Sequence, residues 1–314
     1  MSFSVSVIIP VYNAEKFIEK SIASALFFDE VNEVVVVDDG STDNSRLIIK
    51  NYQRIDDRVK IFHHKGNLNK GRSASRNLGM LMAKEPYITF LDADDFYLEN
   101  RFVRDKILLE QEDLDGTYNA VGFEFYRNTI EEEQHHFRTA TLSKDVVPEE
   151  LFENIVSSKL GYLHLNGLTI KRSVCDSIGF FNEDLVVAED SDFIFKLAIK
   201  KRLAASSINN IVSKRGIHDT NIFNNKSLYQ EYNLKLYESL IDWGLKNNIS
   251  DENQDLLWST LWVIKFRKKE SLLSYIAYWG KLMIRWPNFA LSSLSIKYFP
   301  IVRLRQELFP FIFN

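Results

Sequence analysis

The amino-acid sequence predicts an α/β fold, in which helices flank a mostly parallel sheet and a helical region follows. In the N-terminal part, short, apolar and largely β-branched segments alternate with segments whose apolar residues recur at helical spacing. Near-continuous apolar runs are typical of parallel strands that are covered on both faces. Strict alternation of strand and helix indicates a doubly wound sheet, which binds ligands beyond the carboxyl ends of its strands.

The individual elements follow from local patterns. Strands are predicted at residues 5–11, 34–37, 59–62 and 87–91. A first helix is predicted from Ile18, a second after the capping residues Ser41 to Asp43, and a third at residues 73–83. The segment after the first strand, "VIIPVYNAEKF", lacks the GxGxxG fingerprint, so an NAD-type site is disfavoured.

The pattern is looser beyond residue 100. Further strands are predicted at residues 119–128 and 161–170, and an amphipathic helix at 192–201. The stretch "EEEQHHF", residues 131–137, is predicted to be a solvated acidic loop. From about residue 227 the chain is predicted to be mainly helical. We therefore expect two parts, a catalytic domain at residues 1–220 and a helical region at residues 221–314.

Composition excludes several classes of protein. Of the 314 residues, 45% are hydrophobic and 26% charged, which are ordinary globular values. The formal net charge of −4 gives no reason to expect a nucleic-acid partner. The single cysteine, Cys175, rules out an internal disulfide. There is no basic leader and no apolar run of membrane-spanning length, so we expect a cytoplasmic protein.

Carboxylates follow two of the predicted strands. Asp92, Asp94 and Asp95 come at the end of "YITFLDADDFY", and "VDDGSTD" follows the second strand. Two acidic strand ends facing one crevice would repel each other unless they share a cation or bind a ligand. Mg²⁺ or Mn²⁺, which prefers oxygen ligands, commonly bridges carboxylates to a diphosphate. The alternative is that the aspartates of "VDDGSTD" only cap a turn and a helix.

Four segments together resemble the glycosyltransferases of family 2, which have the Rossmann-like GT-A fold. They are "VSVIIPVYNAEKFIEKSIASAL", "EVVVVDDGSTDNS", "GRSASRNLGMLMAKEPYITFLDADDFY" and "EDSDFIFKLA". The match covers roughly residues 4 to 220, and the combination is highly specific. The resemblance implies an inverting transferase that moves a sugar from a nucleotide-diphosphate sugar, usually a uridine one, to a glycan.

The resemblance also implies roles on the donor side. Pro10, Val11, Tyr12 and Asp39 would surround the nucleotide base. Asp94 would be the most direct ligand of Mn²⁺ or Mg²⁺, and Asp92 would lie nearer the ribose while sharing in the metal site. Family members often carry an aspartate at the position of Asp95, to which the resemblance assigns no clear role.

Basic residues are needed near the charge that develops on the departing diphosphate. In the family, an arginine–asparagine pair like Arg76-Asn77 lies near this site, and a basic stretch like "KRGIHDTNIF", which includes His218, closes over the diphosphate. The alternatives are a solvated basic face around Arg76 and a surface or packing role for His218.

The attacking sugar hydroxyl needs a general base. The segment "VVAEDSDFIF" supplies Glu189, Asp190 and Asp192 at the start of a predicted helix. Acidic residues in a first helical turn are also favoured by the helix dipole alone. By the resemblance, Asp190 is the catalytic base and Glu189 orients the acceptor, whereas Asp192 has only the dipole role.

The expected acceptor is a glycan, on a lipid or lipopolysaccharide, assembled at the inner face of a bacterial plasma membrane. Transfer to polyprenyl phosphate is the nearest alternative, since a phosphate oxygen attacks with little help from a base. A sugar-1-phosphate nucleotidyltransferase is disfavoured, because "PVYNAEKF" lacks a glycine-rich basic loop. A non-catalytic nucleotide-sugar-binding protein is disfavoured by the intact acidic motifs.

The C-terminal segment has a different composition. Residues 261–314 contain nine Lys or Arg and two Glu, a formal charge of +7. Aromatic residues are interleaved, and five of them could form an apolar contact with lipid: Trp262, Trp279, Trp286, Phe289 and Phe299. Basic faces with aromatic anchors suit an anionic membrane surface. The alternative is a helical subdomain that packs on the catalytic core.

Overall fold

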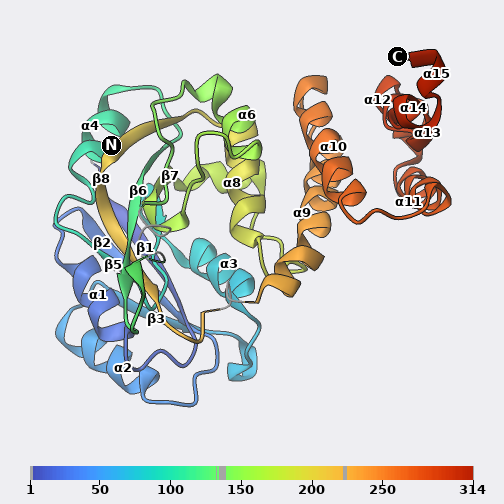
Figure 1. Ribbon diagram of the computed structural model, residues 1–314. Coiled ribbons are helices and arrows are strands. Elements are labelled where there is room, and N and C mark those ends of the chain that lie inside the picture. The colour runs from blue at the N-terminus through green and yellow to red at the C-terminus, as the bar shows by residue number, and fades with distance from the viewer. Residues whose placement is uncertain (1–2, 132, 134–138, 222–224, 314) are drawn as a thin grey trace. The chain divides into compact units, whose positions relative to one another are not determined.

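The structure is a computed structural model that describes residues 3–131, 133, 139–221 and 225–313 (Figure 1). The chain divides into two compact units, unit 1 (Met1–Tyr229) and unit 2 (Gln230–Asn314). The division falls inside helix α9 (Lys226–Lys246). Most of the acidic loop predicted at residues 131–137 lies outside the described residues.

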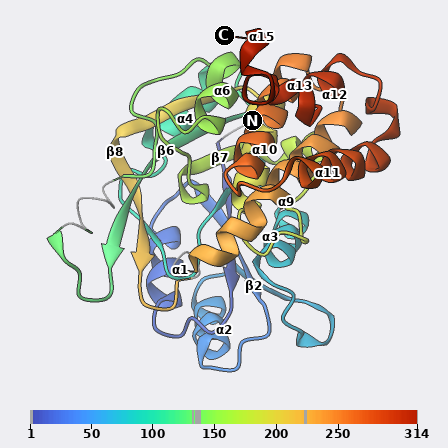
Figure 2. The same ribbon diagram turned by 45° about the vertical axis from the view of Figure 1, so that its right-hand side comes forward.

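Unit 1 is built on a mixed sheet with the strand order β3-β2-β1-β4-β7-β6-β8-β5. The strands are β1 (Val5–Val11), β2 (Val31–Asp38), β3 (Val59–His63), β4 (Tyr87–Phe90), β5 (Phe96–Tyr97), β6 (Gly116–Phe125), β7 (Leu168–Lys171) and β8 (Leu203–Ile217). Strands β3, β2, β1 and β4 run parallel. Strand β7 is antiparallel to β4 and β6. Strand β8 lies parallel beside β6 (Figure 2) and antiparallel to β5.

The helices alternate with the strands as the sequence predicts. Unit 1 contains α1 (Ile18–Leu26), α2 (Ser45–Ile55), α3 (Arg72–Met82), α4 (Val103–Gln111), α6 (Leu151–Val156), α7 (Cys175–Ile178) and α8 (Glu189–Lys200). After α9, unit 2 continues with α10 (Asp251–Phe266), α11 (Leu272–Arg285), α12 (Ser293–Lys297), α13 (Pro300–Arg303), α14 (Arg305–Leu308) and α15 (Pro310–Phe313). The predicted fold class, an α/β sheet with a helical C-terminal region, is confirmed.

Helices cover both faces of the sheet, with α1 and α2 on one side and α3 and α8 on the other (Figure 1). Successive residues of a strand point to opposite faces. Val7 and Ile9 of β1 therefore join the core formed with α1 and α2, whereas Ile8 meets Gly79 of α3. On that second face Phe90 packs against Phe193 of α8, with 5.9 Å between the ring centroids. Burial on both faces explains the near-continuous apolar runs.

The carboxyl ends of the parallel strands meet at one edge of the sheet. Val11 of β1 pairs with Asp38 of β2, and Ile8 pairs with Phe90 of β4. The segments that follow these strands consequently open on the same side. This edge is where doubly wound sheets bind their ligands.

The strand predicted at residues 161–170 is wrong in its first part, because β7 begins only at Leu168. The backbone N–H of Asn166 donates to Nδ1 of His164 over 3.3 Å. This bond caps a 3₁₀ turn, Leu165–Gly167. The His164 side chain thus stabilises a turn where the apolar pattern predicted a strand. Hydrophobic periodicity does not reveal such a local hydrogen bond.

Unit 2 has an aromatic interior. Trp262, Trp286 and Phe289 are buried, and the ring of Trp279 packs against Phe299 with 5.0 Å between centroids. The expectation that these aromatic residues contact a membrane is wrong for the three buried ones, because they fill the core of the unit. No helix in the described part of the chain is both long and apolar enough to cross a membrane.

Candidate active site

A cavity of about 330 Å³ opens at the carboxyl edge of the sheet in unit 1. The residues predicted to bind donor and metal all line it: Pro10, Val11, Tyr12, Asp39, Arg76, Asp92, Asp94 and His218. The residues predicted on the acceptor side, Glu189 and Asp190, begin helix α8 and are not among the described residues of its wall. The fold thus gathers the donor motifs around one space.

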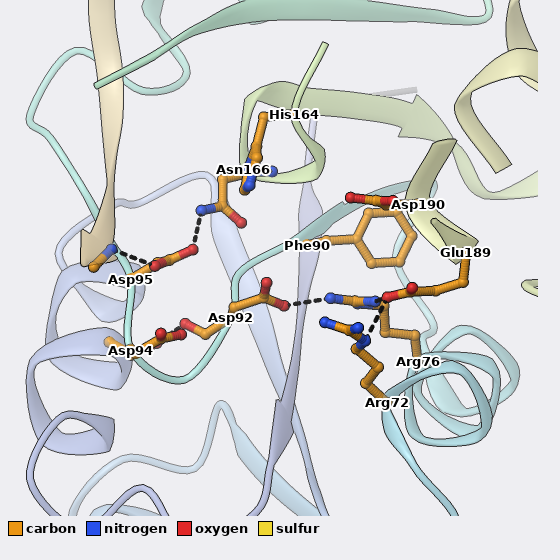
Figure 3. Close-up of polar contacts among 12 residues, drawn as sticks. Arg72, Arg76, Phe90, Asp92, Asp94, Asp95, His164, Asn166, Glu189 and Asp190 are labelled. Atoms are coloured by element: carbon orange, nitrogen blue, oxygen red, sulfur yellow. Dashed lines mark hydrogen bonds and ion pairs between the residues drawn. The ribbon is translucent and has the colours of Figure 1, made fainter. Parts of the chain in front are cut away.

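The guanidinium of Arg76 joins the two acidic motifs (Figure 3). Its Nη2 donates to Oδ1 of Asp92 over 2.6 Å, and its Nη1 donates to Oε1 of Glu189 over 2.8 Å. The Arg76 side chain is only 3% exposed. One buried cation on α3 therefore fixes both the turn after β4 and the start of α8.

This arrangement determines the charge of Asp92. Burial on its own would raise the pKa of Asp92, but the charge and hydrogen bond of Arg76 outweigh it and hold the pKa at about 2. Burial would likewise lower the pKa of Arg76, and the charges of Asp92 and Glu189 raise it instead. Both partners are consequently charged at neutral pH.

Glu189 is an internal residue in this structure. Its carboxylate also forms an ion pair with Nε of Arg72, over 2.7 Å, and its side chain is 2% exposed. Burial raises the pKa of Glu189, and the adjacent charge of Asp190 adds to this against the effect of both arginines. The predicted contact of Glu189 with an acceptor stays a prediction, since the structure gives this carboxylate two arginine partners.

Asp190 has a different setting from its neighbour. Among the described residues its carboxylate accepts hydrogen bonds only from Ser191, from the backbone N–H over 2.7 Å and from the hydroxyl over 3.4 Å. Ala188, directly before the helix, has a left-handed backbone with φ +64°. Such backbone strain in a residue other than glycine is common at functional sites. This turn directs the Glu189 carboxylate toward the arginines and leaves the Asp190 carboxylate without an ion pair in the described chain.

Asp94 lies opposite the end of β8. Its Oδ2 is 2.8 Å from Nε2 of His218 and accepts a weaker hydrogen bond from Nδ2 of Asn221 over 3.3 Å. The imidazole of His218 stacks on Phe17, with 5.1 Å between ring centroids. The structure thus brings the predicted residues Asp94 and His218 together. It also adds Phe17 and Asn221, for which the sequence carried no signal beyond their nearby motifs.

Asp95 acquires a role that the sequence did not define. Its Oδ1 accepts the backbone N–H of Gly216 over 2.7 Å, and its Oδ2 accepts from Nδ2 of Asn166. Burial, together with the charges of Asp94 and Asp92, raises the pKa of Asp95 well above its usual range. Asp95 therefore ties the turn after β4 to the end of β8 and to the turn before β7 (Figure 3).

At the end of the cavity that is predicted to hold the nucleotide, Asp39 organises the loop before α3. Its two oxygens accept the backbone N–H groups of Lys70 over 2.7 Å and Gly71 over 2.8 Å. Gly40 has φ +80°, and a β carbon there would lie 2.6 Å from the carbonyl oxygen of Asn67. Only glycine allows this close approach. Oδ1 also lies 3.5 Å from Nε2 of His64, whereas Oδ2 retains a lone pair for a ligand in the cavity.

The remaining aspartates of "VDDGSTD" have the structural role that was the alternative. Asp38 is fully buried and accepts from the N–H of Ser41 over 3.0 Å and Nε of Arg46 over 2.7 Å. Asp43 accepts from the N–H of Ser45 over 3.0 Å at the start of α2. Within this motif, only Asp39 lines the cavity.

The side chains around Asp94 fit a hard divalent cation in part. Asp94 and His218 approach each other on the cavity wall, and Asp92 has no described hydrogen bond to its second oxygen. Carboxylate oxygens are the ligands that Mg²⁺ and Mn²⁺ prefer. Among the described residues, however, no three His, Cys, Asp or Glu side chains form a ready-made metal site. A metal here would need further ligands from the donor or from water.

Comparisons with known proteins establish the family. The model of glycosyl transferase family 2 matches residues 6–179, more than half of the 314 residues, so the chain belongs to this family. An uncharacterized glycosyltransferase of Haemophilus influenzae is 40% identical over 120 residues, 38% of this chain and 47% of the relative. The uncharacterized glycosyltransferase EpsJ of Bacillus subtilis is 30% identical over 199 residues, 60% of this chain and 54% of the relative. The chain spans about half the length of these relatives.

Solved structures share the fold. TarS 1-349 of S. aureus in complex with UDP-GlcNAc has a TM-score of 0.64 at 19% identity, over 84% of this chain and 73% of that one. The mannosyltransferase PcManGT of Pyrobaculum calidifontis, in complex with GDP-Man and Mn²⁺, has a TM-score of 0.51 at 15% identity, over 99% and 88% of the two chains. At such identities the likeness shows the fold alone, and it confirms the predicted GT-A class.

His164 is a buried residue that sequence analysis did not single out. Burial and the charge of Arg215 lower the pKa of His164 to about 4, although Asp92 and Asp190 oppose the shift. In the unfolded chain the pKa would be about 6.5. Between about pH 6.5 and about pH 4, the His164 side chain is therefore protonated in the unfolded chain and neutral in the folded protein. Acid in this window therefore favours unfolding.

We expect His164→Asn to remove this acid sensitivity. Asparagine keeps an oxygen that can accept the N–H of Asn166 but cannot titrate. Between about pH 7 and about pH 4.5 the wild type should lose on the order of 2 kcal/mol more stability than the variant. Urea unfolding at both pH values measures this difference. Equal losses in the two proteins would show that His164 titrates normally in the folded state.

Proposed function

We propose that the protein is an inverting glycosyltransferase that moves a sugar from a nucleotide-diphosphate sugar, with uridine as the preferred base, to a hydroxyl of a glycan. The observation that carries this proposal is the pairing of two acidic sites through Arg76. Asp92 belongs to the cavity and Glu189 to the helix that presents Asp190. Family membership supports it, as do neighbours of the same fold in complex with UDP-GlcNAc, UDP or GDP-Man.

The donor would occupy the cavity with its base near Pro10, Val11 and Tyr12. Tyr12 is 52% exposed, so its ring is free to stack on a planar base. Asp39, which is fixed by two backbone N–H groups, would accept a hydrogen bond from the base or ribose. The diphosphate would then extend toward Asp92, Asp94 and His218.

These residues would hold a divalent metal at the diphosphate. Asp94 would be the main ligand, and Asp92 would contribute the oxygen that Arg76 leaves without a hydrogen bond. Bound Mn²⁺ or Mg²⁺ would stabilise the negative charge of the departing nucleoside diphosphate. Arg76 would keep Asp92 ionised and in place, and His218 would approach from the other side of Asp94.

On the acceptor side, Asp190 would take the proton of the attacking hydroxyl. Within the described residues its carboxylate forms no ion pair with an arginine or lysine and accepts hydrogen bonds only from Ser191. Glu189 would act as a positioning residue, because Arg72 and Arg76 bury it. A single base without a protein nucleophile implies one direct displacement, which inverts the anomeric carbon.

We further propose that the acceptor belongs to bacterial surface polysaccharide or lipopolysaccharide. Similar proteins occur in the bacteria Haemophilus influenzae and Bacillus subtilis, which supports a bacterial setting. Such glycans are assembled on lipid carriers, so the enzyme would work at the inner face of the plasma membrane. A lipid-linked glycan and an anionic membrane surface would then be its partners.

The metal role gives a direct test of the proposal. Asp94→Asn should abolish metal-dependent binding of the nucleotide sugar while the protein stays folded, because Asp94 lies at a strand end and not in the core. EDTA should stop transfer by the wild type, and Mn²⁺ or Mg²⁺ should restore it. Thermal shifts with a panel of nucleotide sugars, with and without metal, measure the binding. Asp57→Asn, an exposed aspartate outside the cavity, is the control. Full transfer activity in EDTA would contradict the metal assignment.

A second prediction concerns the base. Asp190→Asn keeps the shape of the side chain but removes its proton acceptor, so kcat should fall by roughly a hundredfold or more at unchanged donor affinity. Steady-state kinetics and donor titrations separate the two quantities. The exposed Asp184 provides the control variant Asp184→Asn. Unchanged turnover in Asp190→Asn would argue against this base and favour the alternative acceptor, polyprenyl phosphate.

A further inference from the structure

Helix α11 in unit 2 has an apolar face that the rest of this unit leaves exposed. Four of its residues recur at helical spacing along one stripe: Leu273, Ala277, Gly280 and Ile284. Tyr275 and Leu282 on the opposite side and Met283 on the flank of the helix are buried in unit 2. The helix therefore turns one apolar side inward and a second apolar stripe toward solvent.

The exposure of this stripe is unusual within the chain. Leu273 is 78% and Ile284 is 84% exposed. Of the five most exposed large apolar side chains described, four lie in unit 2: Leu273, Ile284, Leu291 and Phe311. The fifth is Ile55 of α2, at 80%. Single exposed apolar residues are ordinary, whereas several gathered on one unit indicate an interaction surface.

Cations accompany the stripe. Arg267, Lys268 and Lys269 are exposed in the turn just before α11, and Lys281 is exposed on α11 itself beside the stripe. None of the four forms an ion pair with a described carboxylate, in contrast to Lys265 of the same unit, which pairs with Glu270 over 2.7 Å. The charge of Lys268 acts on the nearby Glu270 carboxylate, but no direct ion pair within the described residues neutralises any of the four.

These features favour one occupant. A second copy related by a two-fold axis would bring the same stripe and the same four cations against themselves, and like charges would oppose the contact. An anionic bilayer surface complements both properties, because aliphatic side chains enter the headgroup boundary while lysine and arginine meet lipid phosphates.

We propose that this surface, the α11 face, docks reversibly on an anionic phospholipid membrane. We define the α11 face as the stripe Leu273, Ala277, Gly280 and Ile284 with the cations Arg267, Lys268, Lys269 and Lys281. Membrane docking itself is argued from the α11 face alone. Its purpose, to hold the enzyme near a lipid-linked acceptor, rests on the proposed function. It assigns the contact to aliphatic residues of one helix and not to the tryptophans in the interior of unit 2.

Vesicle co-sedimentation of the full-length protein tests the α11 face. The wild type should bind vesicles containing phosphatidylglycerol, bind pure phosphatidylcholine vesicles much less, and dissociate at high salt. Leu273→Gln with Ile284→Gln should weaken binding by roughly tenfold, since two exposed aliphatic contacts are lost. Arg267→Gln, Lys268→Gln and Lys269→Gln together should weaken it at least as much. The matched control is Ile55→Gln, a similarly exposed isoleucine in unit 1, which should bind like the wild type.

A failure of the membrane proposal can be distinguished from a failure of the proposed function. Vesicle binding needs no donor, and thermal shifts with nucleotide sugar and Mn²⁺ on the same samples report the cavity separately. Equal vesicle binding by the wild type and both α11 variants would overturn the proposal. A second result would also overturn it: the wild type does not bind anionic vesicles but self-associates, and the double variant Leu273→Gln, Ile284→Gln is a monomer. The surface would then bind a second copy of the chain and not a membrane. Loss of binding in variants that keep the wild-type melting temperature would support the proposal.

Discussion

The buried guanidinium of Arg76 is the constraint on which the site depends. Asp92 and Glu189 lie far apart in the sequence. Glu189, at 2% exposed, would be costly to bury as an unpaired charge, and Asp92 is partly buried, at 30% exposed. Arg76 donates to both, over 2.6 and 2.8 Å, and Arg72 adds a second cation at Glu189. A buried cation with two carboxylates is stable only while every partner is present, because removing one leaves an uncompensated charge. The turn after β4 and the start of α8 are therefore positioned together.

The other carboxylates around the cavity are also fixed by hydrogen bonds, each from its own protein groups. Asp39 accepts two backbone N–H groups, Asp95 accepts from Gly216 and Asn166, and Asp94 faces His218. These bonds orient the cavity wall before any nucleotide sugar is bound. Such preorganisation lowers the free energy that is needed to arrange groups around a transition state. Asp190 differs from them in having no described donor apart from Ser191. This looser pairing supports the general-base role that we propose for Asp190, since a proposed base must be free to accept a proton whereas the other carboxylates hold position.

Much of the fold could be predicted from the sequence, because burial on both faces leaves a direct mark in apolar runs such as that of β1. The gathering of the acidic strand ends around one cavity could also be predicted, since their spacing and order match a family; their role as a ligand site stays a prediction. The partners of Glu189 and Asp95 could not be predicted, because they come from segments more than fifty residues away. The inward orientation of Trp262 and Trp286 was equally inaccessible, since an aromatic pattern does not distinguish a helical core from a lipid contact. A local hydrogen bond at His164 ended the extended segment that periodicity suggested.

The most direct test of this account is donor affinity and turnover in Glu189→Gln. Glutamine keeps the shape of the side chain but removes the charge that holds Arg76, and Glu189 itself is not a described part of the cavity wall. We predict that the variant binds nucleotide sugar with metal more weakly and also turns over more slowly, because the loss reaches Asp92 through Arg76 and Asp190 through α8. Glu183→Gln, which alters an exposed carboxylate bonded to Asn77, should leave both quantities near wild type. Wild-type donor affinity and turnover in Glu189→Gln would contradict the coupling of the two acidic motifs.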